Sequence, residues 1–488
     1  MMNKIKYLVL IVICTLTVLN GCKKGGGDPI TPDPDPNPPI PGVTLNLPKK
    51  EIRAVWISTA WGLDWPIGVY GEAQQKQAYV SMLDKFKELR INSIFFQVKA
   101  MGDAFYNSPY EPWAASIAGA RGKDPGYDVL KFLIEEAHNR GIEFHAWMNP
   151  YRIATRANST TNYPDLHPSI DPDWVVSHEK IQIYNPAIPE VRARLVDIIK
   201  DLVAKYDVDG IHFDDYFYPD PASAGQMVAD QGDYAKYGQG YTTIEAFRRA
   251  NVDKAIQTVH DAIVATKPAV VFSVSPAANK DYNYNTLYAD VAKWCQEGWL
   301  DLLIPQLYQE IGNKSNDFQT NLAVWSQYNY TAALVIGHAI YKFGDVAQAT
   351  AFQSVAELEK QFDLTKRNKK SVGSALYSAK YVMGNKIGVT DKLAALYKNP
   401  AVMPFMGRST LPDPAVVGNL KISGGKLSWA KSEGMKAVIY YFSDLKAEGT
   451  VFAVTDAAEV AITQKGYYCV SFINRDNKEG KVSDPIQF

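Results

Sequence analysis

Cysteine is scarce in this sequence, with only four residues in a chain of 488. Cys14 and Cys22 fall in the N-terminal segment, so Cys295 and Cys469 alone remain for the rest of the chain. Two cysteines so far apart provide no disulfide framework, and we expect each to be a buried free thiol. The fold must therefore be stabilised by a hydrophobic core, for which a 47% hydrophobic content is sufficient.

An excess of charge of either sign is also lacking. The chain has 51 Lys and Arg against 52 Asp and Glu, a formal net charge of -1. Proteins that bind nucleic acids usually present a basic patch or stripe, and no Lys/Arg run of that kind is seen. These features exclude the nucleic-acid-binding class. Aromatic residues, in contrast, are plentiful at 12% of the chain.

The N-terminus has the pattern of a secretory signal. Lys4 and Lys6 precede the apolar run YLVLIVICTLTVL, which is too short to span a membrane comfortably. The run ends in Leu-Asn-Gly-Cys at 19–22, which resembles a bacterial lipobox. We expect residues 1–22 to be a lipoprotein signal peptide and Cys22 to carry the lipid; a plain signal peptide cut nearby is the alternative. The predicted location is the cell envelope, as an outer-membrane lipoprotein facing the periplasm or the surface, with the lipid as its only membrane contact.

Three further segments follow this signal. Residues 23–49 begin KKGGGDPITPDPDPNPPIPG, whose alternating Pro and Asp favour a stiff, extended tether. Residues 50–408 alternate strand-like stretches with helical ones. Residues 409–488 contain short alternating strands separated by turns, which predict a small all-β sandwich. The Leu427-Ser428-Trp429 start and the tyrosine-rich later strands resemble a fibronectin type III module.

Eight β-then-α units between 50 and 408 predict an α/β fold, a (β/α)8 TIM barrel. A doubly wound open sheet is the alternative, but no Gly-x-Gly-x-x-Gly follows the first strand. The strand-like stretches are IRAVWIST, NSIFFQVK, IEFHAWMN, VDGIHFDD, VVFSVSP, DLLIPQLY, AALVIGHAIY and VGSALYS.

Several of these strands become polar on one face near the carboxyl end. In a barrel one parity of each strand fills the lumen, and active sites lie at the carboxyl ends of the strands. Ile211 and Phe213 belong on the helices, so His212 and Asp214 should point inward. The same reasoning points these side chains inward on three other strands: Gln97, Lys99, His145, Trp147, Asn149, Gln306, Tyr308 and Glu310. Unpaired polar groups in a lumen are costly, which indicates a site rather than a purely structural barrel.

Carboxylates dominate this predicted site. Asp214 ends a strand, Asp215 begins the loop above it, and Glu310 lies at the mouth on another strand. Two carboxylates in different surroundings can serve as acid and as base or nucleophile, which is the usual arrangement of a glycosidase. Aromatic residues of the surrounding loops would stack on sugar rings: Trp61, Trp65, Trp113, Tyr151, Tyr216 and Tyr218.

The chain also resembles the glycosyl-hydrolase-like 10 family of secreted bacterial proteins across most of 50–405. The stretches that carry the resemblance are EIRAVWIST, QVKAMGDAFY, EPWAASIAG, KDPGYDVL, HAWMNPYR, DGIHFDDYFYP, FRRANVD and PQLY. The resemblance implies a glycoside hydrolase acting on peptidoglycan glycan strands after their peptides are removed. One departure is Lys99-Ala100, where the family usually has Arg-Pro, and lysine lacks the planar fork of arginine.

These observations together give a candidate site in an enzyme that we expect to be a monomer without a cofactor. Its catalytic carboxylates are Asp214, Asp215 and Glu310, and its substrate is a polysaccharide. Arg152 would hold an acidic or N-acyl substituent. Candidate substrate contacts are Trp61, Gln97, Asp103, Trp113, His145, Asn149, Tyr151, Arg152, His212, Tyr216, Gln306 and Tyr308.

Three alternatives stay open. A carbohydrate-binding or scaffold protein on a degenerate barrel would explain why GHAIYKF, on strand seven, has no Glu. A metal site is disfavoured because Asp209 and His212 have opposite parity. DGIHFDDY is also faintly similar to the chitinase-type family-18 motif, with Tyr216 in place of the acid Glu. The proton donor would then be Asp215 or Glu310, and assistance by a sugar N-acetyl group would be possible.

Overall fold

The computed structural model describes residues 38–158 and 160–488, so the predicted signal peptide, Cys22 and most of the tether lie outside the described residues. Eight parallel strands close into a barrel in the order β1-β11-β10-β9-β8-β7-β3-β2. This confirms the predicted (β/α)8 barrel, and the open-sheet alternative is wrong. The strands are β1 (Ile52–Ile57), β2 (Ser93–Lys99), β3 (Glu143–Met148), β7 (Gly210–Phe213), β8 (Val271–Val274), β9 (Leu302–Leu303), β10 (Ala333–Ala339) and β11 (Ser371–Tyr377).

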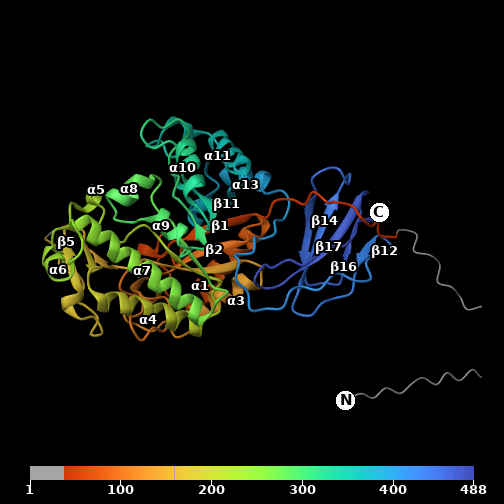
Figure 1. Cartoon of the computed structure of the whole chain (residues 1–488). Helices are drawn as coiled ribbons and strands as arrows, with labels where there is room; N and C mark the ends of the chain where they lie inside the picture. The colour runs from red at the N-terminus through yellow and green to blue at the C-terminus, as the bar shows by residue number, and fades with distance from the viewer. Residues whose placement is uncertain (1–37, 159) are drawn as a thin grey trace, which may run out of the picture.

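Helices surround the barrel (Figure 1). Polar N-caps start several of them: Asp128 accepts the backbone N–H of Lys131, and Thr243 accepts that of Ala246. None of the described helices is both long and apolar enough to cross a membrane. The longer helices are α1 (Glu72–Glu88), α3 (Val129–His138), α4 (Pro189–Lys205), α7 (Ile244–Thr266), α10 (Phe318–Tyr328), α11 (Ala356–Arg367) and α13 (Val389–Leu396), and the shorter ones are α2 (Ala115–Ala118), α5 (Pro221–Ala224), α6 (Gln231–Tyr237), α8 (Lys280–Asn285), α9 (Val291–Gln296) and α12 (Ala379–Gly384).

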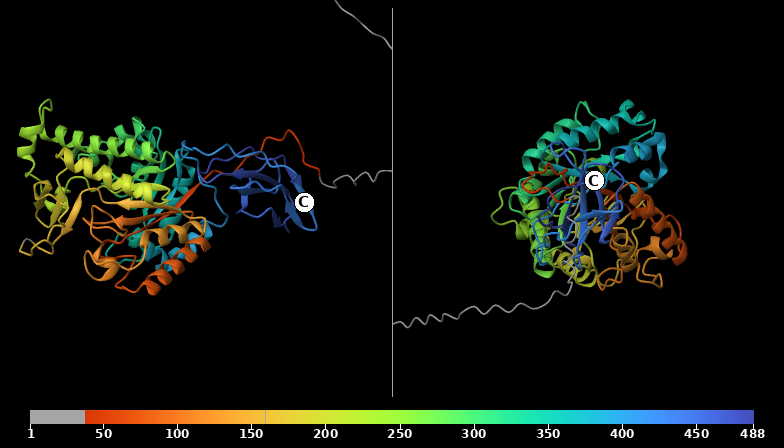
Figure 2. Two further views of the ribbon diagram at one scale, coloured as in Figure 1. Left: turned by 90° about the horizontal axis from the view of Figure 1, so that it is seen from below. Right: turned by 90° about the vertical axis from the view of Figure 1, so that its right-hand side faces the viewer.

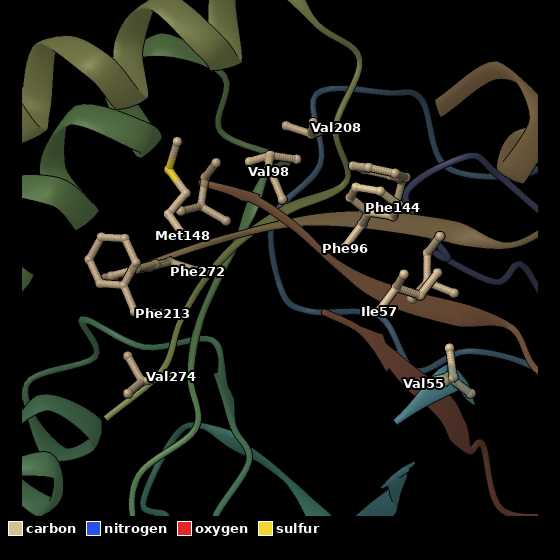
Figure 3. Close-up of a cluster of buried hydrophobic side chains, with 14 of the residues drawn as sticks. Val55, Ile57, Phe96, Val98, Phe144, Met148, Val208, Phe213, Phe272 and Val274 are labelled. Atoms are coloured by element: carbon tan, nitrogen blue, oxygen red, sulfur yellow. The ribbon is translucent and has the colours of Figure 1, made fainter. Parts of the chain in front are cut away.

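The outward face of the strands forms the main core, between barrel and helices. Side chains of one parity gather there, because alternate residues of a strand point to opposite faces. Figure 3 shows this layer, in which all the labelled side chains are apolar. They are Val55, Ile57, Phe96, Val98, Phe144, Met148, Val208, Phe213, Phe272 and Val274, and all are buried.

The inward face forms a second, smaller core inside the barrel. Trp56, Phe95, Trp147 and Val335 are among its buried members. His212 lies in the same lumen with no exposed surface, and its Nε2 accepts a hydrogen bond from Trp56 Nε1 at 3.1 Å. Nδ1 of His212 lies 2.8 Å from Ser273 Oγ. Burial lowers the pKa of His212 well below its usual value, so this imidazole is neutral and fully paired.

An antiparallel sheet is inserted between β3 and α4. It consists of β4 (Arg152–Thr155), β5 (Val175–His178) and β6 (Ile181–Tyr184), with β6 in the middle. Because β4 follows directly on β3, this sheet is attached to the carboxyl end of the barrel.

The C-terminal segment forms two small antiparallel sheets, as expected for an all-β unit. One has the order β12-β13-β16 and the other β15-β14-β17-β18. Leu427, Trp429 and Tyr468 are buried within a core of their own, and the predicted free thiols Cys295 and Cys469 are both buried. The strands are β12 (Lys421–Ser423), β13 (Lys426–Ser428), β14 (Lys436–Phe442), β15 (Thr450–Thr455), β16 (Glu459–Ala461), β17 (Tyr467–Ile473) and β18 (Ile486–Gln487).

This C-terminal unit lies against the amino ends of the barrel strands (Figures 1 and 2). The Asn477 side chain donates a hydrogen bond to the carboxylate of Glu143 at the start of β3, and Arg475 forms an ion pair with Asp207 just before β7. The chain before β1 runs along the same unit, where Ile40 N donates to Pro485 O at 2.8 Å. The carboxyl ends of the barrel strands therefore face away from the C-terminal sheets.

Replacing His212 by Phe should destabilise the barrel. The change would leave the buried Trp56 Nε1 without an acceptor and Ser273 Oγ with only its bond to Ile211 O, at an expected cost of about 2–4 kcal/mol in the free energy of unfolding. Urea unfolding followed by circular dichroism measures this difference. The control is His260→Phe, because among the described residues the side chain of His260 hydrogen-bonds only to its exposed neighbour Asp261, and the change should alter stability by less than about 1 kcal/mol. Equal stability of the two variants would contradict a structural function for His212.

Candidate active site

Asp214 lies immediately after β7, at the carboxyl end of the barrel, and is almost completely buried. Trp147 Nε1 donates to its Oδ2 at 3.2 Å, and Asn149 Nδ2 donates to Oδ1 at 3.2 Å. Both donors come from the end of β3, the neighbouring strand. Burial raises the pKa of Asp214, whereas the Arg152 guanidinium and these two hydrogen bonds oppose the rise.

Asp215 is the next residue, and its side chain is only partly buried. Burial raises its pKa to about 7, and the negative charge of Asp214 adds to the rise. A hydrogen bond from the Gln306 side chain has the opposite effect. Asp215 therefore holds its proton up to neutral pH at a position with access to solvent, as a general acid requires.

Gln97 positions the loop after β1. Its Oε1 accepts hydrogen bonds from the backbone N–H groups of Thr59 at 3.0 Å and Ala60 at 2.9 Å. The next residue, Trp61, is 75% exposed. Gln97 thus fixes the loop that carries the exposed Trp61 indole at this edge of the site.

Tyrosines at or after the carboxyl ends of β9, β10 and β11 form the adjoining part of the mouth. The ring of Tyr308 lies 6.0 Å from that of Tyr377 and 6.1 Å from that of Tyr341. Burial raises the pKa of both Tyr308 and Tyr377, and the charges of Asp215 and Asp214, respectively, make smaller contributions to the rise. Tyr377 was not among the predicted residues, although it ends β11 with the same parity as the lumen residue Ala375.

Asp64 is a second residue that the sequence did not single out. It is buried, and it accepts hydrogen bonds from Ser58 N at 2.7 Å and from Ser378 Oγ at 2.8 Å. These bonds join the loops that follow β1 and β11. No motif or parity marks Asp64, because it lies in a loop whose path the sequence does not reveal.

A cleft with a volume of about 610 Å³ opens beside the carboxylates. The Arg152 guanidinium lies 5.8 Å from the Trp61 ring and 5.1 Å from the Tyr216 ring. All three residues line the cleft, and Tyr216 is 45% exposed. Three predicted contact residues from separate segments of the chain are thus brought together.

The two predicted histidines lie too deep in the barrel to reach a substrate. His145 is 2% exposed, and its Nε2 lies 3.2 Å from the carboxylate of Glu143, the first residue of β3. His212 is buried between Trp56 and Ser273, as described above. Parity alone does not indicate depth: a residue two positions earlier on a strand lies about 6.6 Å lower in the barrel.

Lys99 and Asp103 also lie away from Asp214 and Asp215. A register shift between Gln97 and Lys99 turns the lysine out of the lumen, which corrects its predicted inward orientation. Lys99 is completely buried, with Nζ 2.7 Å from Met101 O and 3.8 Å from Glu111 Oε1. Asp103 accepts the N–H of Met101, and the nearby charge of Lys99 opposes the rise of its pKa on burial.

Of the predicted aromatic contacts, several are core residues. Tyr151, Trp65 and Tyr218 each have at most 2% of their surface exposed, and Trp113 packs against the main core. Their side chains are apolar enough to be buried beneath the loops, so they support the mouth rather than line an open surface. Tyr218 alone also contributes to the cleft wall.

Glu310 is not brought next to the aspartates. Its carboxylate accepts a hydrogen bond from Asn313 Nδ2 at 2.9 Å, and its charge acts on Lys342. Gln306 is the residue of this segment that interacts with Asp215. The described residues contain no group of three His, Cys, Asp or Glu arranged to hold a metal ion.

Replacing Asp215 by Asn should stabilise the protein above neutral pH. The pKa of Asp215 is higher in the folded state than in the unfolded chain, so wild-type stability from this group is greatest below about pH 4 and is lost as the pH rises towards 7. Asn cannot ionise, and we expect a gain of about 1–3 kcal/mol at pH 8 that disappears near pH 4. Thermal unfolding between pH 4 and 8 measures it. The surface control is Asp261→Asn, whose stability should depend on pH as the wild type does. If the stability of Asp215→Asn also showed the wild-type pH dependence, the prediction would be contradicted.

Comparison with known proteins identifies the family of this chain. Residues 51–354 match the family described as Glycosyl hydrolase-like 10. Glycosyl hydrolase YngK of Bacillus subtilis (strain 168) is 37% identical over 378 residues, which cover 73% of this chain and 74% of that protein. Glycosyl hydrolase DigH of Escherichia coli (strain K12) is 31% identical, over 76% of this chain and 92% of that protein. The PgaB (BpsB) glycoside hydrolase domain from Bordetella bronchiseptica aligns over 72% of this chain and 99% of its own, with a TM-score of 0.49 and 11% identity. The chain belongs to the glycosyl hydrolase-like 10 family.

Proposed function

We propose that this protein is a glycoside hydrolase that cleaves peptide-free glycan strands of peptidoglycan. Its family and its named relatives support the hydrolysis of glycosidic bonds. The observation that carries the proposal is Asp215, a partly exposed carboxyl group whose pKa is raised to about 7 beside a second carboxylate.

In this mechanism Asp215 is the proton donor. It transfers its proton to the glycosidic oxygen as the bond between that oxygen and the anomeric carbon breaks, so the leaving sugar departs as an alcohol. Water then supplies a hydroxyl group to the anomeric carbon, and its proton restores Asp215. The glycosidic bond of the substrate is then hydrolysed, and the protein has returned to its starting state.

Asp214 acts on the reaction through Asp215. Hydrogen bonds from Trp147 and Asn149 hold its side chain in one orientation, and its charge keeps the proton on Asp215 near neutral pH. Glu310, the third predicted carboxylate, accepts a hydrogen bond from Asn313, and its charge acts on Lys342. We therefore assign the acid chemistry to the adjacent aspartates.

We also propose that the protein is attached to the cell envelope by a lipid on Cys22. The Leu-Asn-Gly-Cys sequence supports this attachment, and an envelope glycan is a substrate within its reach. The C-terminal unit has a three-stranded and a four-stranded sheet, which favours a fibronectin type III-like module. We propose that this module stabilises the barrel and contributes no residue to the site.

The substrate is tested with protein that begins at residue 23, which retains every described residue. Purified peptide-free murein strands and peptide-bearing strands are incubated separately, and the products are identified by mass spectrometry. We expect cleavage of the peptide-free strands and little or none of the peptide-bearing strands. Binding without any product would instead favour a carbohydrate-binding scaffold, and cleavage of both substrates at equal rates would overturn the substrate class.

The assignment of the two aspartates makes a separate prediction about pH. Asp215→Asn should reduce kcat by about 10²–10⁴-fold, because it removes the proton donor. In Asp214→Asn the charge that raises the pKa of Asp215 is absent, so the upper pKa of the kcat/KM profile should fall below about 7. Asp261→Asn, on the outer helix α7, is the matched control and should keep the wild-type profile. An unmoved upper limb in Asp214→Asn would show that another group is the acid.

A further inference from the structure

The cleft beside the aspartates combines aromatic rings with positive charge. Trp61 and Tyr216 both line it and are 75% and 45% exposed, and the Arg152 guanidinium lies 5.8 Å and 5.1 Å from their rings. Exposed aromatic rings offer the faces on which sugars stack. A neutral sugar would need no cation at such a place.

Three cations line this cleft: Arg152, Arg156 and Lys180. None of them has a carboxylate within salt-bridge distance among the described residues, in contrast to most buried arginines of the barrel. The only acidic residue of the cleft is Asp220, whose carboxylate is engaged by the Tyr282 hydroxyl at 2.5 Å and by Ala222 N at 3.0 Å. The cleft therefore has an excess of positive charge in a protein whose net charge is only -1.

The arginines are fixed by neutral groups, which hold their position without cancelling their charge. Arg152 Nε donates to Ala100 O at 3.0 Å. Arg156 Nε donates to Glu179 O at 2.7 Å, and its guanidinium lies 4.5 Å from the Tyr163 ring. An arginine held in this way is preorganised to bind an anion, because little side-chain entropy remains to be lost.

The inserted sheet β4-β6-β5 supplies these cations. Arg152 begins β4, Arg156 follows its end, and Lys180 precedes β6. Tyr216, which lines the cleft, follows Asp215 directly in the chain, so the cleft adjoins the aspartates. A group bound there would lie on a sugar adjacent to the bond that is cut.

We propose that this cleft is a subsite for a sugar ring that carries a carboxylate. The sugar ring stacks on the exposed face of Trp61 or Tyr216, and Arg152, Arg156 and Lys180 bind the carboxylate. This inference rests on the proposed function and specifies the substrate class further. In a peptide-free murein strand the carboxylate is the lactyl carboxyl group, which an attached peptide converts into an uncharged amide. The cations thereby supply a physical reason for preferring strands without peptides.

The test compares charged strands with neutralised strands. Peptide-free strands are treated with carbodiimide and methylamine, which converts their carboxylates into methylamides of nearly the same size. Wild-type protein beginning at residue 23 should cleave the untreated strands with a kcat/KM about tenfold higher, mainly through a lower KM. Equal kcat/KM for the two substrates would overturn the inference while leaving the glycosidase function intact.

Variants then locate the effect in the cleft. In Arg156→Gln/Lys180→Gln the ratio of kcat/KM for untreated over neutralised strands should fall about tenfold, towards one. The control is Arg367→Gln/Lys398→Gln, which removes two exposed cations elsewhere and should keep the wild-type ratio. A ratio that stays at the wild-type value in the cleft variant would place the anion site elsewhere and overturn the inference.

Binding separates this inference from the proposed function. The affinity of wild-type protein for untreated and neutralised strands is measured by isothermal titration at 4 °C. If no strand is cleaved but untreated strands bind about tenfold more tightly, the proposed hydrolysis fails and the anionic subsite stands. If both kinds of strand bind equally, the subsite fails whatever the catalytic result.

Discussion

The alternation of side chains along eight parallel strands is the constraint on which this structure depends. One parity must be apolar to bind the surrounding helices, and the layer of Val55, Phe96, Phe144 and Phe213 satisfies it. The other parity is then free to change character with depth. It is aromatic and closely packed inside the barrel, around Trp56 and Phe95, and becomes acidic only after the last residue of β7.

Two adjacent aspartates gain different properties from this depth. Asp214 still belongs to the barrel, where indole and amide donors from β3 fix it. Asp215 begins the loop and reaches solvent. Burial and the neighbouring charge of Asp214 together raise the pKa of Asp215. The same strand end continues into Tyr216, so the proposed acid and the proposed sugar-stacking ring lie on one short segment.

Much of this arrangement was predictable from the sequence, and the failures have identifiable physical causes. Strand periodicity predicted all eight barrel strands, and parity brought Asn149 and Asp214 together. It misplaced His145, because periodicity does not measure height within a barrel. It misplaced Lys99, because one register shift reverses the face on which a side chain lies.

Loop residues were the least predictable. Asp64 and the cationic cleft depend on how loops and the inserted sheet fold over the barrel, and no periodic pattern encodes that path. Tyr151 and Trp65 are of the residue types that stack on sugars, yet the loops bury them. Tyr377 could have been found by extending the parity argument to the last strand, which ends with the same alternation as its neighbours.

The contact between the C-terminal sheets and the amino ends of the barrel strands has a consequence for delivery of the enzyme. Residue 40 meets Pro485 on those sheets, so the chain enters the structure on the side opposite the catalytic mouth. With Cys22 lipidated as proposed, the lipid would be joined to the protein through the C-terminal unit and not through the rim of the mouth. Attachment to a membrane would then leave the mouth unobstructed for a glycan strand.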